Sequence, residues 1–366
     1  MIRVLQVSSA RALGGGERHL ADLTRGLHER GHELLVTLRE GSPLRALLDF
    51  LPEQNFHTLP LRNSIDIGSA RRLARIARER KVDLIHAHVA RDYAPAAFAA
   101  RLAPASRLVV TRHVLFPLSR ANWLALSNVA RVIAVSEPVA LALKTQKIFG
   151  KDKVRVVENG VDLARFDRAR AAAEPDIPGR PFRVGIIGEL SVIKGQEEFV
   201  RAAALIRNDF GERVEFLIAG GDNSGGEYRA RVERLVHELN LANHVRLLGR
   251  VEDVSSLFVK LDVLVSASYS ESFGMAMAEA FACGVPVVAT ATGGARSLIE
   301  DGVSGLLVPR GDVRALAAAV TSLLSDEERR LALGASARRS ARERFSLRRM
   351  VEATERVYEE ALGRVV

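Results

Sequence analysis

The chain has 366 residues, of which 48% are apolar and 27% charged, and its formal net charge is +9. The apolar fraction excludes an intrinsically disordered chain, and the length exceeds what one hydrophobic core usually serves, so we expect two domains. One cysteine, Cys283, is too few for a disulfide framework, and no run of about 18 apolar residues could span a membrane, so we expect a cytoplasmic protein.

The first part of the chain alternates short β-branched runs with helical patterns. Between the first two runs, Leu20, Leu23 and Leu27 recur at helical spacing, and Gly31 can end the helix. Strands that alternate with helices predict βαβ units and a parallel sheet covered on both faces. The strands expected in this part are Ile2–Val7, Glu33–Leu38, Val82–His88, Leu108–Thr111, Val132–Val135 and Val154–Val157.

Residues 168–181 interrupt this alternation, because RARAAAEPDIPGRP holds three prolines and few large apolar side chains. We interpret the segment as a linker between an N-terminal domain over 1–168 and a second domain over 182–345. The strands expected in the second domain are Phe182–Ile187, Val214–Ala219, Val245–Leu248, Val263–Ser266, Val285–Ala289 and Leu306–Val308. Because ligands of such sheets bind outside the carboxyl ends of the strands, the turns that follow strands are the candidate sites.

Two of these turns have residues that suit a phosphorylated ligand. Gly14–Gly16 precedes the first helix, where glycines allow close backbone approach and helix amides can face an anion. A glycine triplet can equally be only a flexible turn. Lys194 follows the first strand of the second domain, where it can neutralise phosphate oxygens or be an ordinary exposed side chain.

A third turn, 270–280 with the sequence SESFGMAMAEA, opens a helix after the apolar strand VLVSAS. Backbone amides at 273–275 would face an anion from the helix N-terminus. The carboxylates of Glu271 and Glu279 would repel phosphate, so they suit the hydroxyls of a sugar or a ribose. The alternative is a capped amphipathic helix with an incidental acidic residue.

In order and context, these segments resemble the retaining glycosyltransferases of family four, which have the GT-B fold. The resemblance spans nearly the whole chain and implies two Rossmann-like, doubly wound α/β domains that face a central cleft. It also implies that a helix over about 346–366 crosses back to the first domain. The matching segments are GGGE at 14–17, ENGVDLARF at 158–166, Lys194-Gly195, ESFGMAMAEA, AFACGVPVVATATGG and EDGVSGLLVP at 300–309.

The resemblance implies transfer of a sugar from a nucleotide diphosphate sugar to a glycan or lipid-linked acceptor hydroxyl, with retention of configuration, in cell-envelope glycan, glycolipid or polysaccharide synthesis. The implied catalytic residues are His113 near sugar and acceptor, Lys194 at the diphosphate and Glu271 at the donor sugar. The other implied donor contacts are Gly15, Gly16, Phe273, Gly274 and Met275 around the diphosphate, Arg250 and Val251 at the base, and Glu279 at the ribose. No metal and no further cofactor is expected, because Lys194 and helix amides supply the positive field.

Two features depart from the simplest interpretation. Many relatives carry arginine where this chain has Glu189, so either Lys194 works with another cation, such as Arg112 or Arg296, or Glu189 points away. His86 and His88 alternate on a strand and could suggest a metal pair, but no third ligand is evident. We therefore interpret both histidines as core or cleft lining.

The positive charge is concentrated in the first part, where residues 1–168 carry 27 Lys and Arg against 16 Asp and Glu. We interpret this excess as a match to an anionic acceptor or an anionic membrane surface. The basic stretch 70–81, ARRLARIARERK, either packs on the sheet with a solvated basic face or docks on lipid. With 5% aromatic residues and no binding motif, nucleic acid is not an expected partner. A sugar-nucleotide epimerase of the same architecture stays an alternative.

Overall fold

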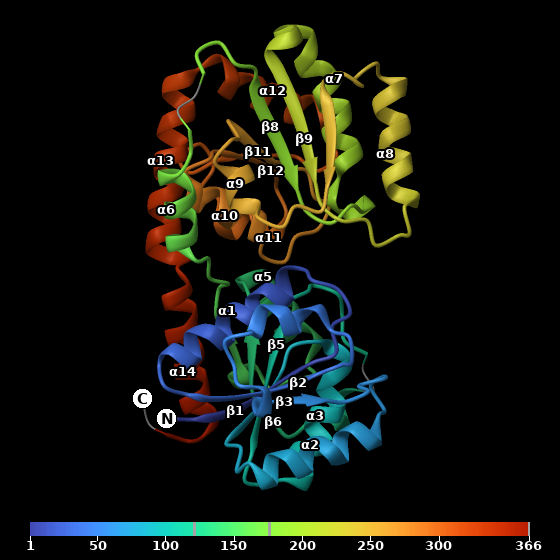
Figure 1. Cartoon of the computed structure of the whole chain (residues 1–366), viewed down its shortest axis with the longest axis vertical. Coiled ribbons are helices and arrows are strands. Elements are labelled where there is room, and N and C mark those ends of the chain that lie inside the picture. Colours follow the sequence, from blue (N-terminus) through green and yellow to red (C-terminus); the bar gives the residue numbers. More distant parts are fainter. Residues whose placement is uncertain (120–121, 175–176, 365–366) are drawn as a thin grey trace. The chain divides into compact units, whose positions relative to one another are not determined.

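The computed structural model describes residues 1–119, 122–174 and 177–364. These residues form two compact units (Figure 1). Unit 1 comprises Met1–Gly160 and the segment from Leu347 onward, and unit 2 comprises Val161–Ser346. Each unit has one parallel sheet with helices around it, which confirms the predicted α/β class. None of the helices in the described ranges combines the length and apolarity needed to cross a membrane.

In its described residues, unit 1 is built on a seven-stranded parallel sheet. Its strands are β1 (Arg3–Ser8), β2 (Glu33–Leu38), β3 (Phe56–Thr58), β4 (Leu84–Ala87), β5 (Arg107–Arg112), β6 (Val129–Ala134) and β7 (Val154–Val156). They lie in the order β3-β2-β1-β4-β5-β6-β7. The chain winds outward in opposite directions from β1 and β4, and such a switch point is where doubly wound sheets bind ligands.

Helices cover both faces of this sheet, because right-handed crossovers on either side of the switch point lie on opposite faces. The helices of unit 1 are α1 (Gly15–Glu29), α2 (Ile67–Glu79), α3 (Tyr93–Leu102), α4 (Asn122–Ala125), α5 (Glu137–Gln146) and α14 (Leu347–Ala361). Helix α1 packs against α14, and α2 packs against α3. In the basic stretch, Leu73 and Ala77 are buried in this packing while Arg71 and Arg75 are exposed, as expected for a sheet-packed helix with a solvated basic face.

Unit 2 repeats the plan with a six-stranded parallel sheet in the residues that the structure describes. Its strands are β8 (Phe182–Ile187), β9 (Val214–Ala219), β10 (Val245–Gly249), β11 (Val263–Ser266), β12 (Val287–Thr290) and β13 (Leu306–Val308). Its helices are α6 (Leu163–Ala171), α7 (Gln196–Phe210), α8 (Glu227–Glu238), α9 (Val254–Phe258), α10 (Met275–Cys283), α11 (Gly293–Leu298), α12 (Val313–Ser325) and α13 (Glu327–Arg344). The strand order is β10-β9-β8-β11-β12-β13, so the switch point lies between β8 and β11.

Helix α14 belongs to the core of unit 1 although it follows the whole of unit 2 in the chain. Tyr358 on α14 is fully buried, and its hydroxyl lies 2.7 Å from His86 Nδ1 on β4. Val351 packs so closely on α1 that a Cβ at Gly26 would lie 2.5 Å from it. These contacts place the helix expected over about 346–366 in unit 1; residues 365–366 lie outside the described ranges.

The boundary between the units differs from the predicted linker at 168–181, of which residues 175–176 lie outside the described ranges. The chain passes from unit 1 to unit 2 between Gly160 and Val161. Helix α6 already belongs to unit 2, because Phe166 is buried there with its ring centroid 6.0 Å from that of Phe258. The predicted first domain, 1–168, was therefore too long.

Candidate functional site

Lys194 and Glu271 meet at the switch point of unit 2. Lys194 lies in a short 3₁₀ turn after β8, and Glu271 lies in the loop after β11. The Nζ atom of Lys194 donates a hydrogen bond of 2.7 Å to Glu271 Oε2, and Ser268 Oγ lies 3.4 Å from the same oxygen. The lysine side chain is 32% exposed and the glutamate side chain 14% exposed. The sequence-predicted pair thus forms one local site at the edge of the sheet.

The turn that carries Lys194 depends on Gly195, the N-cap residue of helix α7. Gly195 has a φ of 72°, in the left-handed region that favours glycine. A Cβ at this position would lie 2.2 Å from the backbone oxygen of Ala267, which directly follows β11. The lysine turn and the strand that leads to Glu271 therefore approach each other more closely than any residue with a side chain would allow.

Substitution of Gly195 by alanine is expected to lower the free energy of unfolding by about 3 kcal/mol, because it combines left-handed strain with a backbone clash. Gly302 of the same unit is the control, since its φ is 76° and a Cβ added there would have no neighbouring atom within 4 Å. Gly302→Ala should cost only about 1–2 kcal/mol from backbone strain. Chemical denaturation of both variants measures the difference, and equal losses would contradict the role given to the Ala267 contact.

The loop from Glu271 leads into the N-terminus of helix α10. Gly274 caps this helix with a φ of 105°, and the buried Phe273 precedes it. The backbone oxygen of Glu271 accepts a 2.9 Å hydrogen bond from the amide of Gly294 at the start of α11. A Cβ at Gly294 would lie 2.7 Å from that oxygen, so α11 holds the loop in place. The first amides of α10, around Met275, have no carbonyl partner within the helix and suit an anion.

The remaining predicted donor residues of unit 2 are spread around this edge. Glu279 is half-buried in α10, about one and a half turns after Gly274. Arg250 is exposed and Val251 half-buried in the loop that follows β10. All these positions follow the carboxyl ends of strands of one sheet, as the spacing of the motifs predicts.

Glu189, which occupies the position where many relatives carry arginine, forms hydrogen bonds with two neighbouring side chains of unit 2. Its Oε1 accepts a 2.9 Å hydrogen bond from Asn223 Nδ2, and its backbone oxygen accepts one of 2.9 Å from Gln196 Nε2. The carboxylate is thus held by Asn223 in the middle of the β9–α8 loop. Of the other cations considered, Arg296 is exposed on α11 of unit 2, and Arg112 is buried in unit 1, where it donates to the backbone oxygen of Phe116.

In unit 1, the glycine turn lies beside His113. Helix α1 begins at Gly15, and Glu17 Oε2 accepts a 2.9 Å hydrogen bond from the amide of Gly14. A Cβ at Gly16 would lie 3.6 Å from the His113 ring, which follows β5. Gly15, Gly16 and His113 therefore share one end of the unit 1 sheet, at its switch point.

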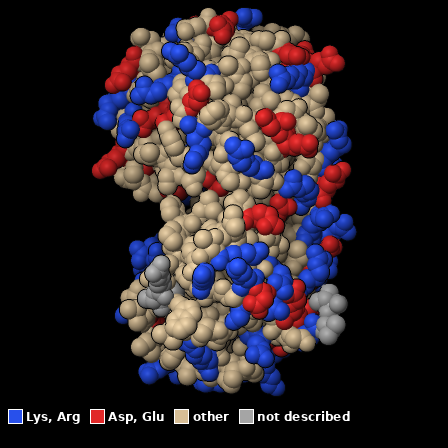
Figure 2. All heavy atoms as spheres, turned by 180° about the vertical axis from the view of Figure 1, so that it is seen from behind, with Lys and Arg blue, Asp and Glu red and all other residues tan. Residues whose placement is uncertain are grey.

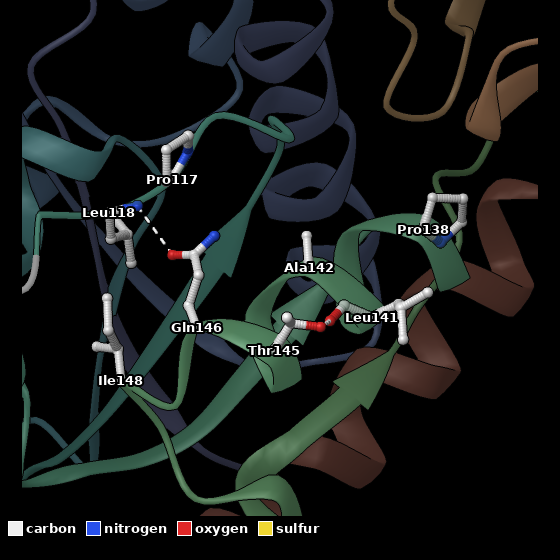
Figure 3. Close-up of a pocket in the computed structure, with 8 residues that line it drawn as sticks. All are labelled: Pro117, Leu118, Pro138, Leu141, Ala142, Thr145, Gln146 and Ile148. Atoms are coloured by element: carbon white, nitrogen blue, oxygen red, sulfur yellow. Dashed lines mark hydrogen bonds between the residues drawn. The ribbon is translucent and has the colours of Figure 1, made fainter.

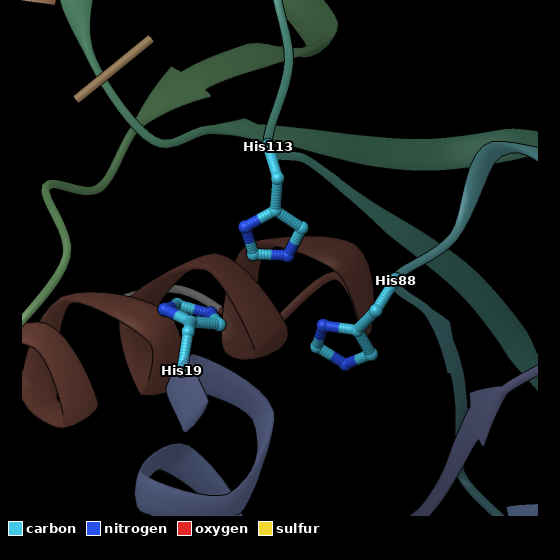
Figure 4. Close-up of side chains that lie close together, drawn as sticks. All are labelled: His19, His88 and His113. Carbon is cyan, nitrogen blue, oxygen red and sulfur yellow. The ribbon is translucent and has the colours of Figure 1, made fainter. Parts of the chain in front are cut away.

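A further histidine was missed in the sequence. The imidazoles of His19, His88 and His113 gather at the carboxyl ends of β4 and β5 (Figure 4). The inference that His88 has no third partner was wrong, because α1 brings His19 to it from a distant part of the chain. His86 stands apart from this group in its bonding, since both its ring nitrogens are paired, with Tyr358 and Thr111. The only feature of the sequence that could have indicated this group is the position of a histidine, His19, on the buried face of α1.

Burial keeps these histidines neutral near pH 7. Burial lowers the pKa of His19 to about 4. It lowers the pKa of His86 to about 3, with a smaller contribution from the charge of His19. The pKa values of His88 and His113 also fall well below the ordinary value, again chiefly through burial and then through the neighbouring histidines. A neutral imidazole offers a lone pair to a proton donor or a cation.

Unit 1 also has an apolar groove of about 660 Å³ between helix α5 and the loop after β5 (Figure 3). Gln146 Oε1 accepts a 2.9 Å hydrogen bond from the amide of Leu118 and so ties the loop to the helix. Phe116, near the groove in sequence, is 61% exposed, and Leu141 on its rim is 68% exposed. The groove is lined by Pro117, Leu118, Pro138, Leu141, Ala142, Thr145, Gln146 and Ile148.

Two family models match the chain in succession. Residues 13–165 match the model described as Glycosyltransferase Family 4, and residues 167–340 match the model described as Glycosyl transferases group 1. The chain belongs to these glycosyltransferases. Within this family assignment, the Lys194–Glu271 pair lies in the group 1 region and the histidine group in the family 4 region.

Curated relatives fall into two groups by coverage. The D-inositol 3-phosphate glycosyltransferase of Salinispora tropica is 37% identical over 231 residues, which are 58% of this chain and 47% of that protein. The alignment thus spans about half the length of that relative. The N-acetyl-alpha-D-glucosaminyl L-malate synthase of Bacillus anthracis is 28% identical over 372 residues, which are 96% of this chain and 95% of that protein.

Solved structures with the same architecture cover almost the whole chain. A glycosyltransferase from Rickettsia africae has a TM-score of 0.85 and 24% identity, over 99% of this chain and 98% of that one. Anabaena HepE in complex with UDP and glucose has a TM-score of 0.81 and 25% identity, over 97% of this chain and 99% of that one. The similarity confirms the predicted GT-B fold.

Proposed function

We propose that this protein transfers a sugar from a nucleotide diphosphate sugar to an acceptor hydroxyl with retention of anomeric configuration. The observation that carries the proposal is the 2.7 Å contact between Lys194 and Glu271 at the switch point of unit 2, beside the N-terminus of α10. A cation and helix amides suit a diphosphate, and a carboxylate suits sugar hydroxyls. The matched families favour transfer over epimerisation.

In the proposed reaction, the bond between the anomeric carbon and the diphosphate oxygen breaks, and negative charge grows on the leaving diphosphate. Lys194 and the amides around Met275 stabilise that charge more strongly than they stabilise the bound donor, which lowers the barrier. Glu271 orients the lysine and accepts hydrogen bonds from the sugar. The acceptor oxygen attacks on the face that the diphosphate leaves, and the departing phosphate takes the acceptor proton.

This chemistry needs no divalent ion at the diphosphate, because Lys194 and the helix amides supply the positive field. We therefore propose metal-independent transfer. The reaction should proceed in the presence of EDTA, and anomer analysis of the product by NMR should show the donor configuration. An inverted product would reject the retaining mechanism, and loss of transfer in EDTA that Mg²⁺ or Mn²⁺ restores would reject metal independence at the diphosphate.

We propose that unit 1 binds an anionic acceptor. Residues 1–168 carry the positive excess, and Figure 2 shows several groups of Lys and Arg side chains on the face of unit 1 seen there. Two relatives are named for acidic compounds, inositol 3-phosphate and malate. The apolar groove at α5 would also accept the chain of a lipid-linked acceptor, with the protein bound peripherally to an anionic membrane surface. Cosedimentation with anionic vesicles tests this, and no binding at low salt would reject it.

Donor binding provides the first test of the function. UDP-glucose is the probe of choice, and a ligand at 100 times its dissociation constant should raise the free energy of unfolding by about 2.7 kcal/mol. Thermal unfolding with UDP-, GDP- and ADP-sugars measures this shift and selects the donor. The shift should shrink in Lys194→Ala and persist in Lys260→Ala, an exposed lysine of the same unit. No shift with any nucleotide sugar would contradict the proposal.

A further inference from the structure

His19, His88 and His113 reach one point from three separate segments of unit 1. His19 lies on α1, His88 directly follows β4, and His113 directly follows β5. The His19 and His113 ring centroids are 4.8 Å apart, and His88 lies 6.1 Å from the first and 6.0 Å from the second. One nitrogen from each ring lies within 4.8 Å of the others (Figure 4).

Two of the nitrogens that face this point have no protein partner. Nδ1 of His88 and Nε2 of His113 are buried without a hydrogen bond among the described residues, and the side chain of Asn159 is the polar neighbour of His19. His19 is 2% exposed and His88 is 5% exposed. Because buried polar atoms in folded proteins are nearly always paired, two unpaired nitrogens that converge on one point indicate a ligand.

The bonding of His88 fixes which nitrogen is available. Its Nε2 lies 2.8 Å from Gln6 Oε1, an acceptor, so Nε2 carries the ring proton and Nδ1 keeps its lone pair. A hydrogen bond from the outer nitrogen to a buried acceptor is the usual support of a metal-bound histidine. His86, with both nitrogens paired, has no such lone pair to offer.

We propose that His19, His88 and His113 bind one divalent transition-metal ion of the zinc class, with its fourth position open. Three neutral imidazoles suit Zn²⁺, whereas Mg²⁺ and Ca²⁺ require oxygen ligands. A Zn–N distance of about 2.1 Å in tetrahedral geometry separates the nitrogens by about 3.4 Å, which each ring reaches by a shift of about 1 Å. Because Gly16 lies beside His113, the ion fixes the start of α1 against the ends of β4 and β5. It takes no part in the departure of the diphosphate, which we assign to Lys194.

The experiment uses the full chain without a polyhistidine tag, stripped with EDTA and dialysed. Zinc titration by calorimetry should give one equivalent, and Co²⁺ should give the visible spectrum of a tetrahedral nitrogen site. The only thiol, Cys283, does not compete, because it is buried in unit 2 and burial raises its pKa to about 12. Less than half an equivalent of bound metal, or no Co²⁺ spectrum, would overturn the proposal.

Variants locate the ion. His19→Ala and His88→Ala should abolish the Co²⁺ spectrum, and Gln6→Leu should weaken zinc binding by about 10-fold or more through its hydrogen bond to His88. His28→Ala, an exposed histidine on the same helix as His19, should bind as the wild type does. Thermal unfolding in EDTA shows which variants are folded, and zinc should raise the melting temperature of wild type and His28→Ala but not that of His19→Ala or His88→Ala. Undiminished binding by a folded His19→Ala protein would contradict the site.

Discussion

Substitution of Lys194 by alanine is expected to lower the rate of sugar transfer by about 10²–10³-fold, because one preorganised donor at a developing charge is worth about that much. The ammonium group lies at the switch point of unit 2, held 2.7 Å from Glu271, and it is the charged group of the proposed diphosphate contacts. Glu271→Ala should cause a loss of similar size, since it removes both the sugar contact and the group that orients the lysine.

Steady-state kinetics with the donor selected by thermal shift measures both losses. Lys260→Ala is the matched control, because it removes an exposed lysine of the same unit. Lys194→Arg keeps the charge but changes its shape and reach, so it should recover only part of the rate. Circular dichroism establishes that each variant is folded. Unchanged turnover in both Lys194→Ala and Glu271→Ala would reject the site.

The free energy of unfolding is expected to fall as the pH is lowered from 7 to 5, measured in EDTA. The pKa of His19 is lowered to about 4 and that of His86 to about 3 in the folded protein, both chiefly by burial. The unfolded chain therefore takes up protons below about pH 6.5 that the folded chain does not, and stability is lost as the pH falls. At pH 5 each of these histidines contributes a loss of about 2 kcal/mol.

Asp92 acts in the opposite direction. Burial raises its pKa to about 6, although its Oδ2 accepts a 2.8 Å hydrogen bond from the amide of Ser9. As the pH falls, the folded protein therefore binds this proton at a higher pH than the unfolded chain does. This adds about 1.4 kcal/mol to the free energy of unfolding at pH 5 and offsets part of the loss from the histidines. The histidine effect is larger, so the net stability falls. In His19→Asn, the free energy of unfolding by urea should depend less on pH than in the wild type. His237→Ala, which removes an exposed histidine on α8, should leave this pH dependence unchanged. A wild-type free energy of unfolding that does not change with pH would contradict the buried neutral state of the histidines.

The regular strands could be predicted because buried parallel strands need continuous apolar, β-branched runs. Phe182–Ile187 and Val214–Ala219 have the predicted bounds of β8 and β9. Strand β3, Phe56–Thr58, was not predicted, because it is a short edge strand of three residues, FHT, without such a run. The boundary at Gly160 was also missed, since composition does not tell which core receives the single buried side chain of α6, Phe166.

The sequence predicted more of the candidate site in unit 2 than in unit 1. Lys194 and Glu271 each follow a strand, and the parallel topology brings strand ends to one edge, so their approach across 77 positions follows from the motifs. The partner of Glu189 did not follow, because Asn223 lies in a loop without a motif. The approach of His19 to His88 depends on the angle at which α1 packs on the sheet, and hydrophobic periodicity does not encode that angle.

The membership of α14 in unit 1 has a consequence for biosynthesis. Val351 and Tyr358 are buried in the first unit but are translated after all of Val161–Ser346. On the ribosome, domains usually fold in the order of their synthesis. Here the second unit can complete its core while the first still lacks a helix, so the nascent N-terminal half exposes apolar surface over α1 and β6 until translation passes residue 361. Chaperone demand should accordingly be greatest late in synthesis.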